Sequence, residues 1–253
     1  MYRKLHIFAL MALALVSCTK EETVREFALQ FNAAVSPEMA VLVRGGEAES
    51  ESVIANHAVL QAWQDNNVLA AKVEQSITPG TTQIPFGGVR LVEGKQYDIY
   101  IWVGCAGYYN VGDLHTVSLA EGKGFDGKSL EFDAFFAHTA VTCSKDEVIH
   151  QVTLKRPFAK VSFSAPVDSV TKISFTAPTG LDLKTGKVLS STKNIEYTVQ
   201  PDTSNVTAFD YIFADEGVTD MDYTFKLGED EEKTVAVPIS RNTKTNIIYN
   251  TAN

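Results

Sequence analysis

Side chains that could act as catalytic bases or nucleophiles occur in this sequence, but they do not form a recognisable catalytic pattern. The sequence contains no G-x-S-x-G elbow, no H-E-x-x-H pair and no glycine-rich phosphate loop. Carboxylates are numerous, so a pair assembled in space stays open as an alternative, although no spacing marks one. The sequence therefore predicts binding or presentation rather than catalysis. Beyond the N-terminal leader the histidines are scattered over segments of different type: His57, His115, His138 and His150.

Two cysteines, Cys105 and Cys143, lie in the body of the chain. In an exported chain they could form a disulfide, but sequence does not give their distance, so the bonded and the free states both stay open. Neither cysteine has a partner at a spacing typical of zinc ligands. The acidic run Glu229–Glu232 is interpreted as a solvated hairpin tip rather than a calcium loop. No metal or other cofactor is predicted.

The third cysteine, Cys18, follows a cationic start and an apolar run over Leu5–Val16. This run is typical of a secretory signal peptide and is too short to span a bilayer. Leu15–Cys18 resembles the lipobox of bacterial lipoproteins, in which the cysteine is acylated and becomes the first residue of the mature chain. The resemblance implies a signal peptide over residues 1–17 and attachment to outer-membrane lipid through Cys18; an ordinary signal with an incidental cysteine is the alternative.

The charge balance excludes one class of partner. Removing residues 1–17, with Arg3 and Lys4, lowers the formal net charge from −9 to −11. Such an acidic chain is not expected to bind nucleic acid. Cys18–Glu22 also resembles the acidic tag of surface-exported lipoproteins of the Bacteroidales, which implies an outer-membrane, cell-surface location.

Aromatic side chains could supply a binding surface. Tyr108 and Tyr109 fall on a predicted loop and could stack on sugar rings; the alternative is that they cap one end of a sandwich. Phe135–Phe136 are a second candidate platform. Their segment, Phe132–His138, is predicted as a short helix or plug against the first sandwich.

The elements that would position these residues are predicted to be strands. Phe27, Leu29, Phe31, Ala33 and Val35 alternate with more polar residues, which indicates a half-buried strand. The segment Ser52–Ala62 fits a strand or a short helix. Many short strands and no long amphipathic helix predict an all-β sandwich architecture. Further predicted strands are Ala58–Trp63, Val68–Val73, Ile84–Val92, Tyr97–Val103, Leu114–Leu119, Val170–Phe175, Ile195–Val199, Phe209–Ala214, Tyr223–Leu227 and Thr234–Ile239.

The alternation changes phase in the middle of the chain. Val152 and Leu154 are apolar at even positions, whereas Val161 and Phe163 are apolar at odd positions. A one-residue change of phase indicates a bulge or a strand that leaves one sheet for another, and Arg156-Pro157 stands at the change. This predicts two β-sandwich domains, over residues 53–155 and 156–253, after a lipidated leader, first strand and linker over residues 18–52.

Several short motifs, in their order along the chain, resemble the fimbrillin-like (type V pilin-like) surface lipoproteins of the Bacteroidales. After the lipobox come a first strand followed by Arg44, then Leu154–Lys160, Asp210–Ala214 and Val237–Asn242. The resemblance implies two transthyretin-like, Greek-key β-sandwich domains in tandem.

In polymerising members of that family, a trypsin-like protease cuts after an arginine, and a donor strand from the next subunit replaces the first strand. The resemblance implies that Phe27–Val35 is the strand removed and that Arg44 is the processing residue. Thr245–Asn250 could be a donor strand or, more simply, the last strand of the second domain. Asp168-Ser169-Val170 matches a three-residue O-glycosylation pattern of these bacteria, which implies possible modification of Ser169.

The first hypothesis is therefore a non-enzymatic, surface-anchored subunit or anchor that assembles with other fimbrial subunits and acts in adhesion. The alternative is a glycan-binding surface lipoprotein of a polysaccharide-uptake system. The sequence does not identify the glycan or host-surface ligand that either role would require. An undetected hydrolase is a third, weaker hypothesis.

Overall fold

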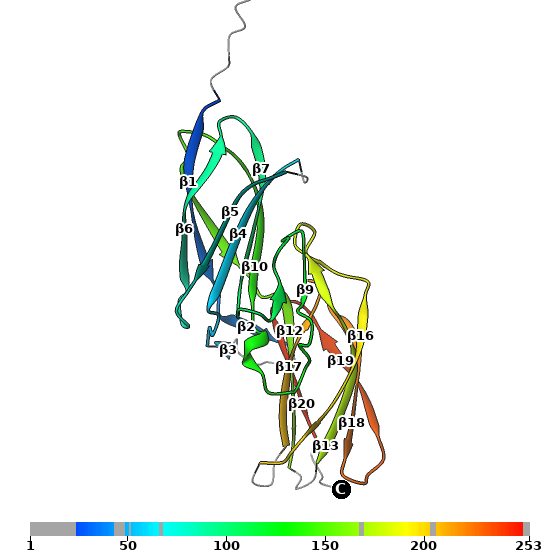
Figure 1. The fold of residues 1–253 in the computed structure, drawn as a ribbon. Helices are drawn as coiled ribbons and strands as arrows, with labels where there is room; N and C mark the ends of the chain where they lie inside the picture. Colours follow the sequence, from blue (N-terminus) through cyan, green and yellow to red (C-terminus); the bar gives the residue numbers. More distant parts are fainter. Residues whose placement is uncertain are drawn as a thin grey trace, which may run out of the picture.

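The computed structural model describes residues 24–42, 49–50, 52–65, 68–166, 170–202 and 206–249. Figure 1 shows an elongated body of strands. Apart from one 3-10 turn, η1 (Leu130–Phe132), the regular elements described are strands, which confirms the all-β prediction. They are β1 (Glu26–Val35), β2 (Glu38–Val41), β3 (Glu49–Ser50), β4 (His57–Gln64), β5 (Val68–Ser76), β6 (Gln83–Val92), β7 (Gln96–Gly104), β8 (Tyr109–Asn110), β9 (Thr116–Leu119), β10 (Phe135–Thr142), β11 (Ile149–Leu154), β12 (Phe158–Ala165), β13 (Thr171–Pro178), β14 (Gly180–Asp182), β15 (Lys187–Val188), β16 (Thr192–Val199), β17 (Val206–Phe213), β18 (Thr219–Leu227), β19 (Lys233–Ile239) and β20 (Thr243–Ile248).

Two sheets enclose a first hydrophobic core. One sheet has the strand order β11-β1-β6, and the other has the order β10-β7-β4-β5. The buried side chains between them include Phe31, Phe86, Ile101 and Leu154. We call this pair of sheets the first sandwich.

Two further sheets enclose a second core, and we call them the second sandwich. Their strand orders are β17-β12-β20-β2-β3 and β16-β13-β18-β19. The core includes Val161, Phe163, Phe175 and Tyr223. β20 lies between β12 and β2 and runs parallel to both, so the C-terminal segment is the last strand of this half within its own chain.

A small sheet of order β15-β14-β9-β8 joins the two sandwiches and covers a third core. Tyr100 and Trp102 of β7 enter this core, whereas Ile99 and Ile101 enter the first core, so β7 is buried on both faces. β10 pairs with β7 along its length, and its Phe135 and Phe136 likewise divide between the two cores. The predicted helix or plug over Phe132–His138 is therefore wrong: only its first residue belongs to η1, and most of it is strand. A strand buried on both faces loses the alternation that would have revealed it.

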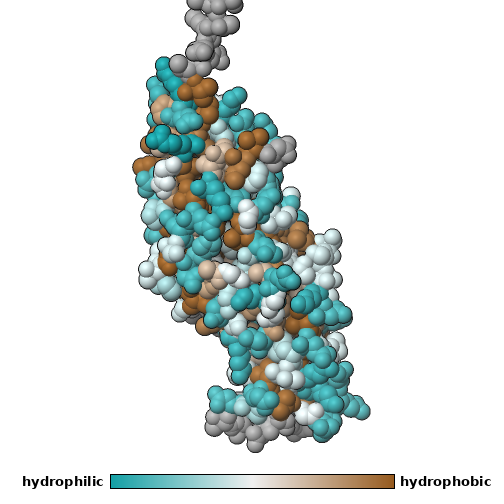
Figure 2. Space-filling view, viewed as in Figure 1, coloured by the Kyte–Doolittle hydropathy of each residue, from teal (hydrophilic) through white to brown (hydrophobic). Residues whose placement is uncertain are grey.

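The surface is mixed, and one exposed sheet edge carries charges. On the face shown in Figure 2, apolar residues are scattered among polar ones. The exposed apolar residues Val68 and Leu69 lie on β5, an edge strand of the first sandwich. Lys72 and Glu74 of the same strand form an ion pair at 2.7 Å. Charges along an edge strand disfavour pairing with another chain, so β5 is a poor template for association.

The chain crosses from the first sandwich to the second at the predicted place. β11 ends at Leu154 in the first core, and β12 begins at Phe158, with Ala159 in the second core. The predicted change of sheet at Arg156-Pro157 is confirmed. The division into domains over residues 53–155 and 156–253 stays a prediction.

Arg156 is fully buried at this crossing and donates hydrogen bonds from all three of its side-chain nitrogens. Its Nε and Nη2 donate to the two carboxylate oxygens of Asp133 at 2.8 and 2.9 Å, and Asp133 is itself buried. Its Nη1 donates to the carbonyl of Pro37 at 2.6 Å, and its Cζ lies 4.6 Å from the centroid of the Phe135 ring. A single side chain thus ties together the segment after β1, the segment before β10 and the turn into β12.

We predict that Arg156→Leu lowers the free energy of unfolding by about 3–5 kcal/mol, because it leaves the Asp133 carboxylate buried without its main partner. The double variant Arg156→Leu/Asp133→Leu should recover part of this loss, since neither charge then remains. Urea denaturation provides the measurement. The control is Lys155→Ala, which removes the adjacent exposed cation and should cost less than about 1 kcal/mol. Equal losses for Arg156→Leu and Lys155→Ala would contradict the assignment.

A second buried acid lies in the other half. Asp210 on β17 is 3% exposed and accepts a hydrogen bond from the hydroxyl of Tyr197 on β16. Burial raises the pKa of Asp210 to about 7, although the Tyr197 hydrogen bond opposes the rise. Between about pH 4 and pH 7 the folded state therefore binds a proton that the unfolded state has lost, so stability falls as pH rises through this range.

Asp210→Asn should remove this pH dependence, because an amide keeps the acceptor for Tyr197 and cannot ionise. Each pKa unit corresponds to about 1.4 kcal/mol, so the wild-type loss between pH 4 and pH 8 is on the order of 4 kcal/mol. Denaturant unfolding at several pH values would measure it. Parallel pH profiles for the wild type and the variant would contradict the prediction.

Candidate functional site

β1 is the central strand of its sheet although it is the first strand of the chain. It runs parallel to β11, from Gln30↔Ile149 to Val35↔Leu154, and antiparallel to β6. Leu29, Phe31 and Ala33 are fully buried in the first core, which confirms the predicted inward face. Without β1, β6 and β11 would each lose a paired neighbour, and the core would be open along the space between them.

The chain then passes directly into the second sandwich. Only Ser36 and Pro37 separate β1 from β2, which runs parallel to β20. The backbone N–H of Ala40 donates to the carbonyl of Asn242 at 3.2 Å, and that of Leu42 donates to Lys244 at 2.9 Å. Residues 26–42 therefore contribute one strand to each sandwich. The strand in the second sandwich, β2, was not predicted from the sequence.

Met39 anchors β2 by burial. Its side chain is fully buried, whereas those of its neighbours Glu38 and Ala40 are exposed. Burying a methionine side chain contributes about 1.5–3 kcal/mol. The apolar run Met39–Val43 is visible in the sequence, but five residues were too few to reveal a strand or its partner.

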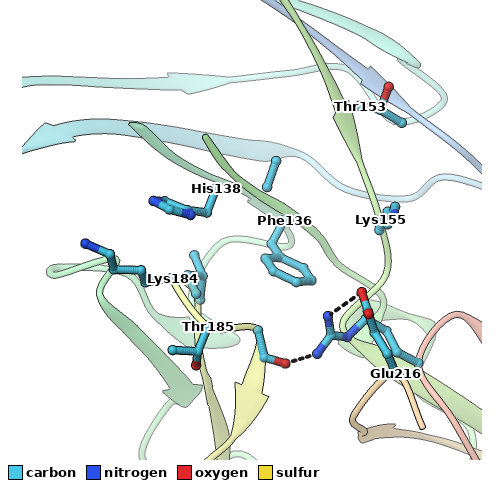
Figure 3. A pocket seen from close by; sticks show the side chains of 11 residues that line it. Phe136, His138, Thr153, Lys155, Lys184, Thr185 and Glu216 are labelled. Carbon is cyan, nitrogen blue, oxygen red and sulfur yellow. Dashed lines mark hydrogen bonds and ion pairs between the residues drawn. The ribbon is translucent and has the colours of Figure 1, made fainter. Parts of the chain in front are cut away.

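A polar pocket of about 230 Å³ lies where the two sandwiches meet (Figure 3). Its wall includes Phe136 and His138 from β10, Lys155 from the crossing, and Lys184 from the turn between β14 and β15. Arg241 and Glu216 close it from the second sandwich. Lys155, Lys184 and Arg241 bring basic side chains to the pocket wall, and Glu216 brings an acid that pairs with Arg241.

Arg241 holds its side of the pocket through contacts to several segments. Its Nε donates to the carbonyl of Ala214 at 3.3 Å, its Nη2 donates to the carbonyl of Gly186, and its Nη1 lies 3.5 Å from a carboxylate oxygen of Glu216. The Cζ atom lies 5.1 Å from the centroid of the Phe136 ring. Burial lowers the pKa of the guanidinium.

His138 forms part of a three-residue contact rather than a free base. Its Nε2 lies 2.7 Å from one oxygen of Asp98 on β7, and Lys184 Nζ donates to the other oxygen at 3.0 Å. Burial opposes ionisation of Asp98, but these two partners lower its pKa below the usual value. Because Asp98 belongs to the first sandwich and Lys184 to the joining sheet, this contact serves cohesion.

The other histidines also lie beside carboxylates, on separate segments. His57 contacts Glu74 at 2.9 Å, and His115 contacts Asp113 at 2.6 Å. Among the described residues, no three His, Cys, Asp or Glu side chains lie together in a group that could hold a metal ion.

The predicted sugar platform at Tyr108 and Tyr109 is not formed. Tyr109 is buried in the third core, where its hydroxyl donates to the carbonyl of Phe132. Tyr108 is partly buried, with Lys123 Nζ 3.9 Å from its ring centroid and Phe132 packed edge-on against it. Phe135 and Phe136 are buried as well. The capping alternative describes these aromatics correctly, because the joining sheet and η1 cover the surface that a sugar would need.

The possible disulfide between Cys105 and Cys143 is also not formed. Both are buried free thiols at opposite ends of β7: Cys105 follows Gly104, and the N–H of Cys143 donates to the carbonyl of Lys95. Nine residues of extended strand separate them by roughly 30 Å, whereas a disulfide needs Cα atoms within about 7 Å. The thiols instead donate to the carbonyls of Ile54 and Leu91.

Three predicted site residues lie outside the described residues: Cys18, the predicted lipidation site; Arg44, the predicted processing site; and Ser169, the predicted glycosylation site. The predicted signal peptide over residues 1–17 lies outside them too. These assignments stay predictions. Within the described ranges, no helix has the length and apolarity needed to cross a membrane.

Residues 20–250 match the model of a protein family described as a family of unknown function, DUF6562. The chain belongs to this family. No curated protein matches the sequence.

Several solved structures share the fold. A candidate adhesin from Bacteroides ovatus superposes with a TM-score of 0.59 at 10% sequence identity, covering 92% of this chain and 90% of that one. The fimbrial anchor protein Mfa2 from Porphyromonas gingivalis gives 0.51 at 11% identity, covering 79% and 78%. A fimbrial assembly protein from Parabacteroides distasonis gives 0.51 at 12% identity, covering 88% and 92%. At these identities the likeness shows a common fold.

The buried thiols lead to a direct chemical prediction. Burial raises the pKa of Cys105 to about 11 and also raises that of Cys143. Because the thiolate is the reactive form, neither residue should react with iodoacetamide near neutral pH in the folded protein, and both should react in denaturant without reductant. The intact mass of a Cys18→Ser chain would give the number of alkylated cysteines. A denatured chain that resists alkylation until it is reduced would contradict the free-thiol assignment.

Proposed function

We propose that this chain is a cell-surface structural subunit or anchor of a fimbrial fibre, held in the outer membrane by an acylated Cys18 and acting in fibre assembly and adhesion. The observation that carries the proposal is the position of β1, the first strand of the chain, at the centre of a sheet between β11 and β6. Its inward side chains fill the first core, so the same strand is both essential to the fold and the one nearest to the N-terminal leader.

Assembly would proceed by strand replacement. A trypsin-like protease cuts after Arg44, β1 leaves, and an extended strand from a neighbouring subunit takes its position. The main-chain bonds to β11 and β6 provide affinity, and the alternate positions of Leu29, Phe31 and Ala33 set the register. The exposed edges and open core that β1 leaves behind favour the exchange.

The comparisons support this class of function. Two proteins that share the fold over most of both chains are described as a fimbrial anchor and a fimbrial assembly protein. A non-enzymatic role follows from the same proposal. The alternative of a glycan-binding lipoprotein rested on Tyr108, Tyr109 and Phe135–Phe136. Burial of Tyr109, Phe135 and Phe136 weakens it, because Tyr108 is then the one ring of these four that is partly exposed.

The test is limited digestion with trypsin of the lipid-free Cys18→Ser chain, followed by intact mass and native-size analysis. Cleavage after Arg44 should yield oligomers whose subunits lack residues 18–44. The matched control is Arg44→Ala, which should keep the N-terminal segment and stay monomeric under the same digestion. Oligomers of equal abundance from the control, or a cleaved protein that loses the segment and stays monomeric, would overturn strand replacement in this chain, and the second outcome would favour an anchor that does not polymerise.

A further inference from the structure

The N-terminal segment occupies two positions, one in each sandwich, and only the first belongs to the strand replacement described above. β1 ends at Val35 and β2 begins at Glu38, so the two positions are separated by Ser36 and Pro37 alone. In Figure 1, β1 runs down the first sandwich and β2 lies at its foot, beside the strands of the second. A cut after Arg44 would therefore free both strands as one piece.

β2 is paired with β20 through its backbone. The two strands run parallel, with Ala40 opposite Thr243 and Val41 opposite Lys244, and the N–H groups of Ala40 and Leu42 both donate to the segment that contains β20. If β2 leaves, these acceptors and one edge of β20 lose their partner. The buried site of the Met39 side chain is emptied at the same time.

The connection between the two positions also carries a specific polar contact. The carbonyl of Pro37 accepts a hydrogen bond of 2.6 Å from Nη1 of Arg156, a side chain with no exposed surface. The other two nitrogens of Arg156 that donate, Nε and Nη2, bind Asp133, which stays in the protein when residues 26–42 leave. Departure of residues 26–42 would leave Nη1 without this acceptor in a buried place, which is costly unless another carbonyl replaces it.

We propose that the β2 position beside β20 is a second acceptor site, continuous with the β1 position, for one extended segment of a neighbouring subunit. That segment fills the β1 position with alternate apolar side chains, supplies a carbonyl to Arg156, and places a large apolar side chain in the Met39 site while running parallel to β20. The proposal rests on the proposed function and extends it from one sandwich to both.

A segment that filled only the β1 position would leave four features unsatisfied: the edge of β20 that faces β2, the edge of β3 that faces β2, the Met39 site and one donor of Arg156. The second site therefore adds a length requirement and a side-chain requirement to partner recognition. It also retains the cleaved N-terminal segment until a partner that satisfies both positions replaces it.

The test uses the full Cys18→Ser chain with a recognition sequence for a specific protease inserted after residue 46, so that cleavage does not depend on Arg44. Labelled peptides of residues 24–44 and 24–35 then compete for the cleaved protein, and native mass spectrometry measures exchange. The longer peptide should bind at least about tenfold more tightly. Met39→Asp in the longer peptide should remove most of this gain, whereas Ala40→Asp, which adds the same charge at an exposed neighbouring position, should change affinity less than about twofold.

Hydrogen exchange provides the structural readout. Amides of Thr243 and Lys244, the part of β20 that pairs with β2, should be protected when the longer peptide is bound and should exchange faster when only the shorter peptide is bound. If the cleaved chain retains its own N-terminal segment, the peptides cannot compete for the site. The substitutions Met39→Asp and Ala40→Asp are then made in the intact chain, and the rate at which each cleaved protein releases its N-terminal segment is measured. We expect faster release only for Met39→Asp.

Equal affinity of the two peptides, equal effects of the two substitutions, or equal protection of β20 would each overturn the second acceptor site. These outcomes are distinct from failure of strand replacement in the proposed function, which is seen when the cleaved protein loses residues 18–44 and forms no oligomers.

Discussion

The buried pairing of Arg156 with Asp133 and with the carbonyl of Pro37 is the constraint on which the arrangement of the two sandwiches depends. An unpaired guanidinium buried in this place would carry a large desolvation penalty. The segments that contain Arg156, Asp133 and Pro37 are therefore stable here only when all three are in position. One of them follows β1, one precedes β10, and one leads into β12. The interaction therefore couples the position of the N-terminal segment to the point at which the chain changes sheets.

The joining sheet supports the same junction from the opposite side. β8 and β9 come from the first half of the chain, and β14 and β15 come from the second, so neither half builds this sheet alone. Its core contains Trp102 from β7 and Phe213 from β17, which places large rings from both sandwiches in one apolar cluster. Around it, Lys184 binds Asp98 and Arg241 binds the loop at Gly186. Apolar contact thus provides cohesion, and the charged contacts fix the orientation.

Local alternation was enough to predict many strands and the change of sheet, because strands such as β1 and β18 have one face in a core and a more exposed opposite face. It failed at Phe135–Phe136, where both faces are buried and the period of two disappears. It could not choose between the alternatives left open for Tyr109 and for the cysteine pair, since burial and separation there depend on elements distant in sequence. The pairing of Arg156 with Asp133 had a faint signal, an acid within an apolar run. Almost no signal in the sequence indicated the role of Met39, because β20, the strand with which β2 pairs, lies at the other end of the chain.

That separation has a consequence for how the protein is made. β1 pairs with β11 more than 100 residues later, and β2 pairs with β20 about 200 residues later. Contacts between such distant segments carry a high loop-closure cost and form slowly. β2, one of the first strands synthesised, is consequently among the last to pair with β20. Until β20 has been exported, β2 lacks its partner in the second sandwich, whereas β1 can already pair with β6 and then with β11.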